Sequence, residues 1–192
     1  MSSTNRSEAR EKHIADYYVT PVNKIIEFLN EFSKHEVLRD KKFLDPCAGG
    51  DDKNLMSYPE ALKQFGIEDS NIITLDIRED SPAQYHGNYL EIDCKNLYNI
   101  IITNPPFNLA RNIIDKALDD VEDGGFVIML LRLNYFGGKL RQDLWESNMP
   151  KYVFVHNRRM SFTEDGKTDS IEYMHCVWQK GYNPEFAQLK VI

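Results

Sequence analysis

Residues 101–107 read Ile-Ile-Thr-Asn-Pro-Pro-Phe and continue an apolar run that begins at Tyr98. The isoleucines are typical of a buried β-strand. The two prolines end such a strand and hold the backbone extended, because proline lacks an amide donor and disfavours helix at the preceding residue. Ligands of open α/β sheets bind at the carboxyl ends of the strands. A group that can hydrogen-bond an amino group and stack on a flat ring is therefore expected there, formed by Asn104, Pro105, Pro106 and Phe107. Taken alone, the same tetrapeptide also fits a turn with a core phenylalanine.

Two further acids follow predicted strands upstream of this stretch. A short strand ends at Asp45 and enters a loop of small residues, in which Gly49 and Gly50 permit positive φ and close approach of the backbone to a ligand. The next strand, over 71–77, carries Asp76 at its tip. An acid at this position, after a first glycine-rich turn, is the usual partner of a ribose diol.

The sequence also argues against the common nucleotide cofactors. The Gly-x-Gly-x-x-Gly fingerprint is absent, which disfavours a nicotinamide or flavin dinucleotide, and there is no Walker A sequence. The loop acids Asp51 and Asp52 would repel a pyrophosphate. An acidic loop instead suits a cofactor that bears positive charge.

Together these elements resemble the amino-group S-adenosylmethionine-dependent methyltransferases, in particular the DNA adenine-N6 methyltransferases. Residues 104–107 resemble their catalytic (Asp/Asn/Ser)-Pro-Pro-(Tyr/Phe) motif, and residues 18–21 resemble an N-terminal cofactor motif. The likeness runs from about Tyr17 to Gly181, and the stretch from Arg158 through Trp178 resembles phage-borne and prophage-borne members. These 192 residues show no obvious room for the separate target-recognition domain that larger members carry. That departure leaves the recognition sequence and the class of nucleic acid open.

The resemblance implies a Rossmann-like class I α/β fold, with a mostly parallel sheet and a C-terminal antiparallel hairpin, and S-adenosylmethionine as cofactor. It places the cofactor against Tyr18, Thr20, Asp45, Pro46, Cys47, Ala48, Gly49, Asp76 and Asp93. Two of these residues also suit a purely structural role, Asp93 as a solvated loop acid and Thr20 as a helix cap. For Cys47 a small buried residue is the better interpretation.

An aryl amino group is a poor nucleophile, so its methylation requires assistance from the protein. Asn104 Oδ1 and the Pro105 carbonyl can accept hydrogen bonds from its two protons, which stabilises positive charge as the methyl group arrives and needs no metal or strong base. Phe107 would stack on the target ring, which must leave a duplex to reach such a pocket. Phe162 is a candidate second stacking face, or equally a packed loop aromatic.

Length and composition predict one catalytic domain over 16–192 behind a flexible tail at 1–15. The polar N-terminus does not resemble a signal peptide, the longest apolar run is too short to cross a bilayer, and the three cysteines lack metal-ligand spacing. We therefore expect a cytoplasmic protein, a monomer or weak dimer, with no membrane or metal partner.

The net charge of −7 counts against a nucleic-acid enzyme. Residues 130–160 nevertheless carry six basic and two acidic side chains, a local +4, which either track a phosphate backbone or form an ordinary mixed surface. The candidate DNA contacts are Arg132, Arg158, Arg159 and Phe162.

Strand and helix patterns alternate as in a doubly wound sheet. After Thr20-Pro21, a helix is expected with Thr20 as its cap and Pro21 at its first position. Further helices are expected near 54–65, 108–121 and from Gly137 to about Trp145. Strands are expected at 42–46, 71–77, 88–92, 98–103, 126–133, 151–157 and 173–180.

Three function classes fit this sequence. The first is a DNA adenine-N6 methyltransferase of phage or prophage type. The second is the same chemistry on an rRNA base or a protein glutamine amide, which the missing recognition domain keeps open. The third is a non-catalytic S-adenosylmethionine-binding domain, which the intact Asn104 disfavours.

Overall fold

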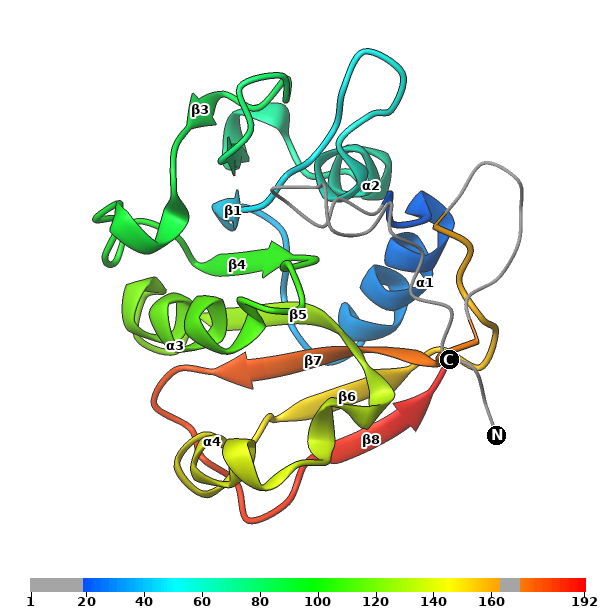
Figure 1. The fold of residues 1–192 in the computed structure, drawn as a ribbon, viewed down its shortest axis with the longest axis vertical. Helices are drawn as coiled ribbons and strands as arrows, with labels where there is room; N and C mark the ends of the chain where they lie inside the picture. Colours follow the sequence, from blue (N-terminus) through cyan, green and yellow to red (C-terminus); the bar gives the residue numbers. More distant parts are fainter. Residues whose placement is uncertain (1–18, 163–169) are drawn as a thin grey trace.

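The computed structural model describes residues 19–162 and 170–192, so the predicted tail and Tyr18 lie outside the described residues. The described residues form a mixed sheet of eight strands in the order β3-β2-β1-β4-β5-β7-β6-β8 (Figure 1). The strands are β1 (Phe43–Asp45), β2 (Ile72–Asp76), β3 (Tyr85–His86), β4 (Ile100–Thr103), β5 (Phe126–Arg132), β6 (Tyr152–Val155), β7 (Tyr173–Gln179) and β8 (Gln188–Val191).

Strand direction divides the sheet into two parts. β1 to β5 run parallel to one another, whereas β7 runs antiparallel to both β5 and β6. β8 then pairs in parallel with β6 at the edge. This arrangement confirms the predicted fold class, a mostly parallel α/β sheet with a C-terminal antiparallel part.

Helices cover both faces of the sheet (Figure 1). α1 (Val22–Phe32) and α2 (Ser57–Phe65) pack with one face, where a buried cluster includes Ile25, Phe28 and Leu62. α3 (Ala110–Asp120) and α4 (Gln142–Ser147) pack with the other face. Single turns of 3-10 helix are η2 (Asp69–Asn71), η3 (Tyr89–Glu91), η4 (Leu133–Phe136) and η5 (Lys139–Arg141). The apolar stripes of α1 and α3 face these cores, at the spacing that helical periodicity requires.

Three local predictions were wrong or incomplete. Residues 88–92 form the turn η3 rather than a strand, because Asn88 Oδ1 accepts a hydrogen bond from Leu90 N and curls the chain. The helix expected from Gly137 is a turn of 3-10 helix, and α4 begins only at Gln142. Neither β3 nor β8 was predicted.

The start of α1 also differs from expectation. Pro21 occupies the N-cap position, and no side chain of residues 19–162 or 170–192 caps the helix. Thr20 does not act as the cap, since its hydroxyl accepts a hydrogen bond from Asn104 instead. The first helix is thereby joined to the predicted catalytic loop, which follows β4.

Candidate active site

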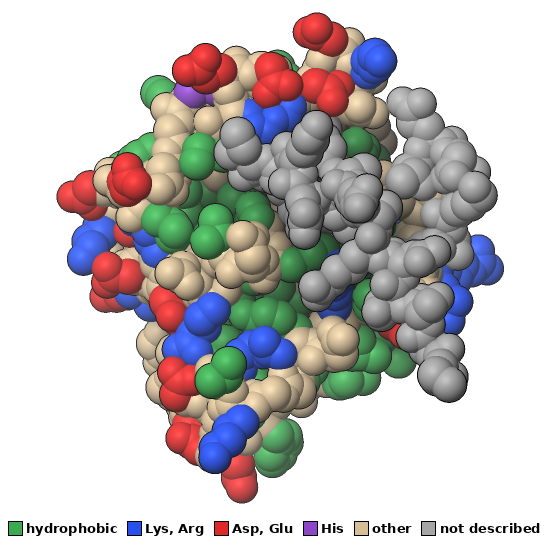
Figure 2. Space-filling view, in the orientation of Figure 1, with side chains coloured by type: hydrophobic (Ala, Val, Ile, Leu, Met, Phe, Trp, Pro, Cys, Tyr) green, Lys and Arg blue, Asp and Glu red, His purple; other side chains and the backbone are tan. Residues whose placement is uncertain are grey.

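A cleft lies where β1, β2 and β4 end, and it encloses about 760 Å³, counting the space open to solvent at its mouth. Hydrophobic side chains gather in the centre of this side of the molecule, with side chains of both charges below them and mostly Asp and Glu along the upper rim (Figure 2). The structure brings many of the predicted site residues to this cleft. They are Thr20, Pro46, Cys47, Ala48, Gly49, Asp76, Asn104 and Pro106.

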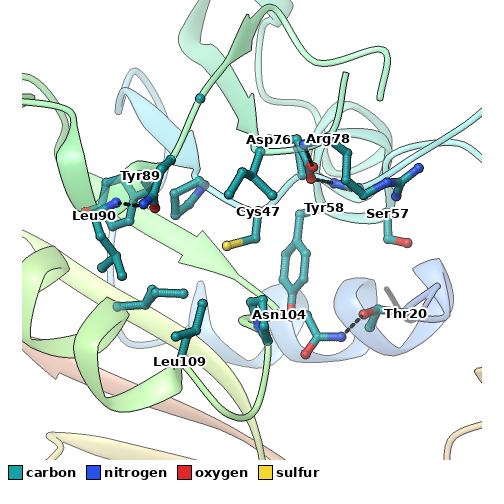
Figure 3. Close-up of a pocket in the computed structure, with 18 residues that line it drawn as sticks. Thr20, Cys47, Ser57, Tyr58, Asp76, Arg78, Tyr89, Leu90, Asn104 and Leu109 are labelled. Atoms are coloured by element: carbon teal, nitrogen blue, oxygen red, sulfur yellow. Dashed lines mark hydrogen bonds between the residues drawn. The ribbon is translucent and has the colours of Figure 1, made fainter. Parts of the chain in front are cut away.

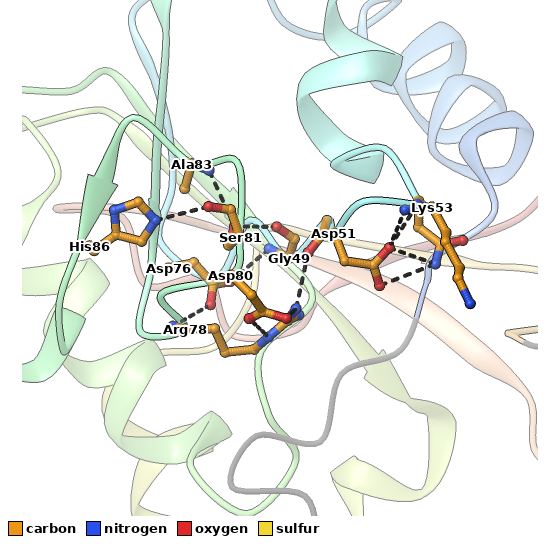
Figure 4. A network of polar contacts seen from close by, with 11 residues as sticks. Gly49, Asp51, Lys53, Asp76, Arg78, Asp80, Ser81, Ala83 and His86 are labelled. Atoms are coloured by element: carbon orange, nitrogen blue, oxygen red, sulfur yellow. Dashed lines mark hydrogen bonds and ion pairs between the residues drawn. The ribbon is translucent and has the colours of Figure 1, made fainter.

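The glycine loop after β1 is fixed by backbone hydrogen bonds. Gly49 and Gly50 both have positive φ, of 65° and 77°. A Cβ atom on Gly50 would lie 2.8 Å from Met56 Cγ, so a side chain there would force a rearrangement. Gly49 N donates to Asp76 Oδ2 at 2.7 Å, and Ser81 Oγ donates to the Gly49 carbonyl (Figure 4). These contacts hold the loop backbone against the tip of β2.

Asp76 is 5% exposed and lines the cleft from the tip of β2. Its carboxylate accepts hydrogen bonds from Gly49 N at 2.7 Å and from Arg78 N at 2.8 Å. An ionised carboxylate offers about four lone-pair directions, so about two remain for a ligand. A vicinal diol, which presents two hydroxyl donors, suits that remaining capacity.

Asp45 lies behind the glycine loop and is not among the residues that line the cleft. Its Oδ1 accepts a hydrogen bond from Cys47 N at 3.2 Å, and its buried Oδ2 has no hydrogen-bond partner among the described residues. Burial raises the pKa of this carboxyl to about 7, and the nearby Asp76 carboxylate adds to the rise. A positive charge in the cleft would lower this pKa again, because it would stabilise the ionised form.

Asn104 projects into the cleft from the end of β4 (Figure 3). Its Nδ2 donates to Thr20 Oγ1 at 3.0 Å, while its buried Oδ1 has no hydrogen-bond partner among the described residues. A buried acceptor without a donor costs free energy in the isolated protein, so it marks a position where a ligand donor would be favourable. Pro106 lines the cleft beside it, and Pro105 is buried.

The predicted stacking residues lie together, outside the lining of the cleft. Phe107 and Phe162 both contact Tyr173, at ring-centroid distances of 6.2 and 4.8 Å. The Arg132 guanidinium lies over the Phe107 ring, 4.2 Å from its centroid. The structure therefore gathers three of the predicted substrate contacts into one aromatic cluster with Leu130 and Met160 beneath it.

The remaining predicted residues are placed less centrally. Arg158 and Arg159 are exposed, and Arg159 lies 3.4 Å from Glu172. Asp93 is exposed and outside the lining of the cleft, and its carboxylate accepts a hydrogen bond from Lys95 N. Tyr18 lies outside the described residues.

Several residues that line the cleft were not predicted from the sequence. Ile77 is 53% exposed beside Asp76, and Asn88 and Leu90 line the cleft from η3 and the residue before it. An exposed isoleucine directly after a strand-tip acid was the available signal. Tyr58 reaches the cleft from α2, and its hydroxyl lies 2.9 Å from the buried His175 Nε2, which fixes the ring as a wall.

Comparison with known proteins shows which solved structures share this fold. No protein-family model matches the chain, and no curated protein matches it at a significant level. Solved structures do match. A type I restriction-modification methyltransferase subunit from Streptococcus thermophilus is 11% identical with a TM-score of 0.66, over 93% of this chain and 48% of that one. This chain therefore spans about half of that subunit.

Two smaller proteins match over most of their own length. A putative RNA methyltransferase from Pyrococcus horikoshii is 14% identical with a TM-score of 0.62, over 86% of this chain and 88% of that one. A putative class I S-adenosylmethionine-dependent methyltransferase from Listeria monocytogenes is 11% identical with a TM-score of 0.61, over 95% and 68%. The chain thus has the Rossmann-like fold of class I methyltransferases.

Two other features of the described residues bear on partners. None of their helices is both long and apolar enough to cross a membrane. They also contain no group of three or more His, Cys, Asp or Glu side chains arranged to hold a metal ion.

Proposed function

We propose that this chain transfers a methyl group from S-adenosylmethionine to the N6 amino group of adenine in DNA. The observation that carries the proposal is the Asn104 carboxamide, whose buried acceptor oxygen has no donor among the described residues and lies in the same cleft as Asp76 and the glycine loop. Asn104 belongs to an Asn-Pro-Pro-Phe sequence, which resembles the catalytic motif of the DNA adenine-N6 methyltransferases.

The residues of the cleft fit such a cofactor. The unused acceptor capacity of Asp76 suits a ribose diol, and the exposed faces of Ile77 and Leu90 suit a flat purine ring. Asn88 lies in the cleft and Asp93 outside it, so we favour Asn88 over the predicted Asp93 as the contact for the amino group of the cofactor's purine. The acid behind the loop, Asp45, favours a ligand that carries positive charge. When bound, the cofactor supplies an electrophilic methyl group.

Asn104 and Pro105 orient the target amine in this proposal. Asn104 Oδ1 and the Pro105 carbonyl would accept the two N–H groups, which would orient the nitrogen lone pair toward the bound cofactor and stabilise the charge that develops on nitrogen until one proton is lost. Thr20 fixes the carboxamide from the opposite side through its hydrogen bond with Nδ2. Phe107, braced by Arg132, offers an aromatic face to the extruded base.

The exposed arginines and the matched restriction-modification subunit support DNA as the substrate. One observation favours RNA as a second candidate, because the match with the putative RNA methyltransferase covers 88% of that protein. A protein glutamine amide would require the same two acceptors. The third function class, a non-catalytic domain, would bind S-adenosylmethionine without transferring its methyl group.

The Asn104→Ala variant tests the assignment of the site. We expect it to bind S-adenosylmethionine with nearly wild-type affinity in calorimetry yet lose most methyl transfer, because the lost contact acts on the reacting amine alone. Asn108→Ala, an exposed asparagine of the same loop, is the matched control and should keep both. Near-normal methyl transfer by Asn104→Ala would mean that the active site lies elsewhere.

A further inference from the structure

The loop between β5 and α4 presents an apolar side chain to water. Leu140 is 92% exposed, more than any other large hydrophobic side chain of the described residues. It stands between Lys139 and Arg141. A scattered exposed leucine is common on protein surfaces, so its surroundings decide whether it has a role.

The loop that carries Leu140 is firmly braced. Arg141 Nε donates to the Tyr135 carbonyl at 2.7 Å, and its other end donates to the Gly137 carbonyl. The same guanidinium lies 4.4 Å from the centroid of the Tyr135 ring. Gly138 has a φ of 102°, a conformation that favours glycine. Leu140 is therefore held outward by a defined set of contacts.

The loop also lies next to the candidate catalytic loop. β5 and β4 are neighbouring parallel strands, so the segments that follow them leave the same edge of the sheet. Arg111 in the first turn of α3 forms two hydrogen bonds, of 2.9 and 2.7 Å, with Asp143 in the first turn of α4. At the end of β5, Arg132 covers the Phe107 ring. These two links fasten the Leu140 loop to the segment that carries Asn104.

We propose that Leu140 is a wedge that enters the base stack of duplex DNA and fills the gap left when the target adenine is extruded. This inference rests on the proposed function. Apolar side chains inserted between bases offset part of the cost of unstacking, and extrusion is a required step for chemistry on a stacked base. Lys139 is positioned to contact the phosphate backbone next to the wedge. Arg141 keeps the loop in place instead of contacting DNA, because its guanidinium is already engaged.

The test compares Leu140→Ala on duplex DNA and on a single-stranded oligonucleotide that carries the same adenine. Initial methyl-transfer rates should fall about tenfold or more on the duplex and remain near wild type on the single strand, since only the duplex has a stack to open. Leu140→Met, which keeps apolar volume, should retain most duplex activity. Val37→Ala, at another exposed apolar residue, is the control for general surface effects.

A fluorescent 2-aminopurine at the target position gives a second readout. Its emission on binding should rise with wild-type protein and with Leu140→Met, and rise less with Leu140→Ala. Unchanged duplex rates in Leu140→Ala, or equal losses on both substrates, would overturn the wedge and leave the proposed function intact. Failure of the wild-type protein to methylate either DNA would instead remove the proposed function and the wedge with it.

Discussion

Replacing Asp76 with alanine tests the proposed binding of S-adenosylmethionine separately from methyl transfer. The carboxylate is nearly buried, accepts two backbone N–H groups and has capacity left for a ligand diol. The substitution removes that ligand contact. It also leaves Gly49 N, which donates to this carboxylate at 2.7 Å, without its acceptor and so loosens the loop that lines the cleft.

The magnitude follows from the cost of an unmet hydrogen bond in a largely buried site. Leaving one buried polar group unpaired costs about 1–3 kcal/mol. The dissociation constant for S-adenosylmethionine should therefore rise by a factor of roughly 5 to 150 in Asp76→Ala. Asp76→Asn should lie between the two proteins, because the amide keeps one acceptor oxygen but turns an NH2 group toward a backbone donor.

Isothermal titration calorimetry measures the affinity, and urea unfolding of the free protein measures the accompanying loss of stability. Asp80→Ala is the matched control. Asp80 lies in the loop that follows Asp76 and contacts Arg78 at 2.8 Å, but it is exposed and outside the cleft. The affinity of the Asp80→Ala protein for S-adenosylmethionine should therefore differ from that of the wild type by less than about threefold. Unaltered cofactor affinity in a folded Asp76→Ala protein would refute the assignment of this acid.

Three other predictions concern the stacking face, the DNA surface and pH. Phe107→Ala should weaken DNA binding and turnover together, whereas Phe107→Trp should recover part of both because stacking survives; equal activity of the two variants would argue against a stacking role. Charge reversal at Arg158 and Arg159 should reduce the dependence of DNA affinity on salt, measured by fluorescence anisotropy, and leave cofactor affinity unchanged; an unaltered slope would place the DNA elsewhere. Because burial raises the pKa of Asp45 to about 7, ionisation of this carboxyl destabilises the free protein as pH rises from about 4 through about 7, and the affinity for a cationic cofactor should increase as pH rises through about 7. Calorimetry across that range should show a flatter pH profile in Asp45→Asn, and identical profiles would contradict the prediction.

The sequence alone predicted the strands and helices that carry long apolar patterns. The isoleucines before Asn104 and the stripe on α1 specify buried elements whatever their neighbours are. β8 escaped prediction because it is a short edge strand with exposed residues, and its formation depends on pairing with β6. Residues 88–92 contain strand-forming side chains, but a local contact with the Asn88 side chain curls them into a turn.

The residues of the candidate site likewise divide into those that local sequence patterns indicate and those that depend on distant contacts. The sequence patterns placed Asp76, the glycine loop and Asn104 at strand ends, and the structure brings them to one cleft. Thr20 looked like a helix cap, since its actual partner Asn104 is 84 residues away and cannot be found from local sequence. The contact of Arg132 with Phe107 likewise forms only when β4 and β5 pair. Long-range contacts of this kind need the folded structure.

The central claim is that the Asn104 site methylates adenine in DNA. The most direct measurement incubates the purified protein with S-adenosylmethionine carrying a labelled methyl group and with separate pools of DNA, RNA and protein, followed by mass spectrometry of the digested products. We predict labelled N6-methyladenine in DNA with the wild-type protein and its loss with Asn104→Ala. Label found only in RNA or protein, or DNA methylation that persists in Asn104→Ala, would contradict it.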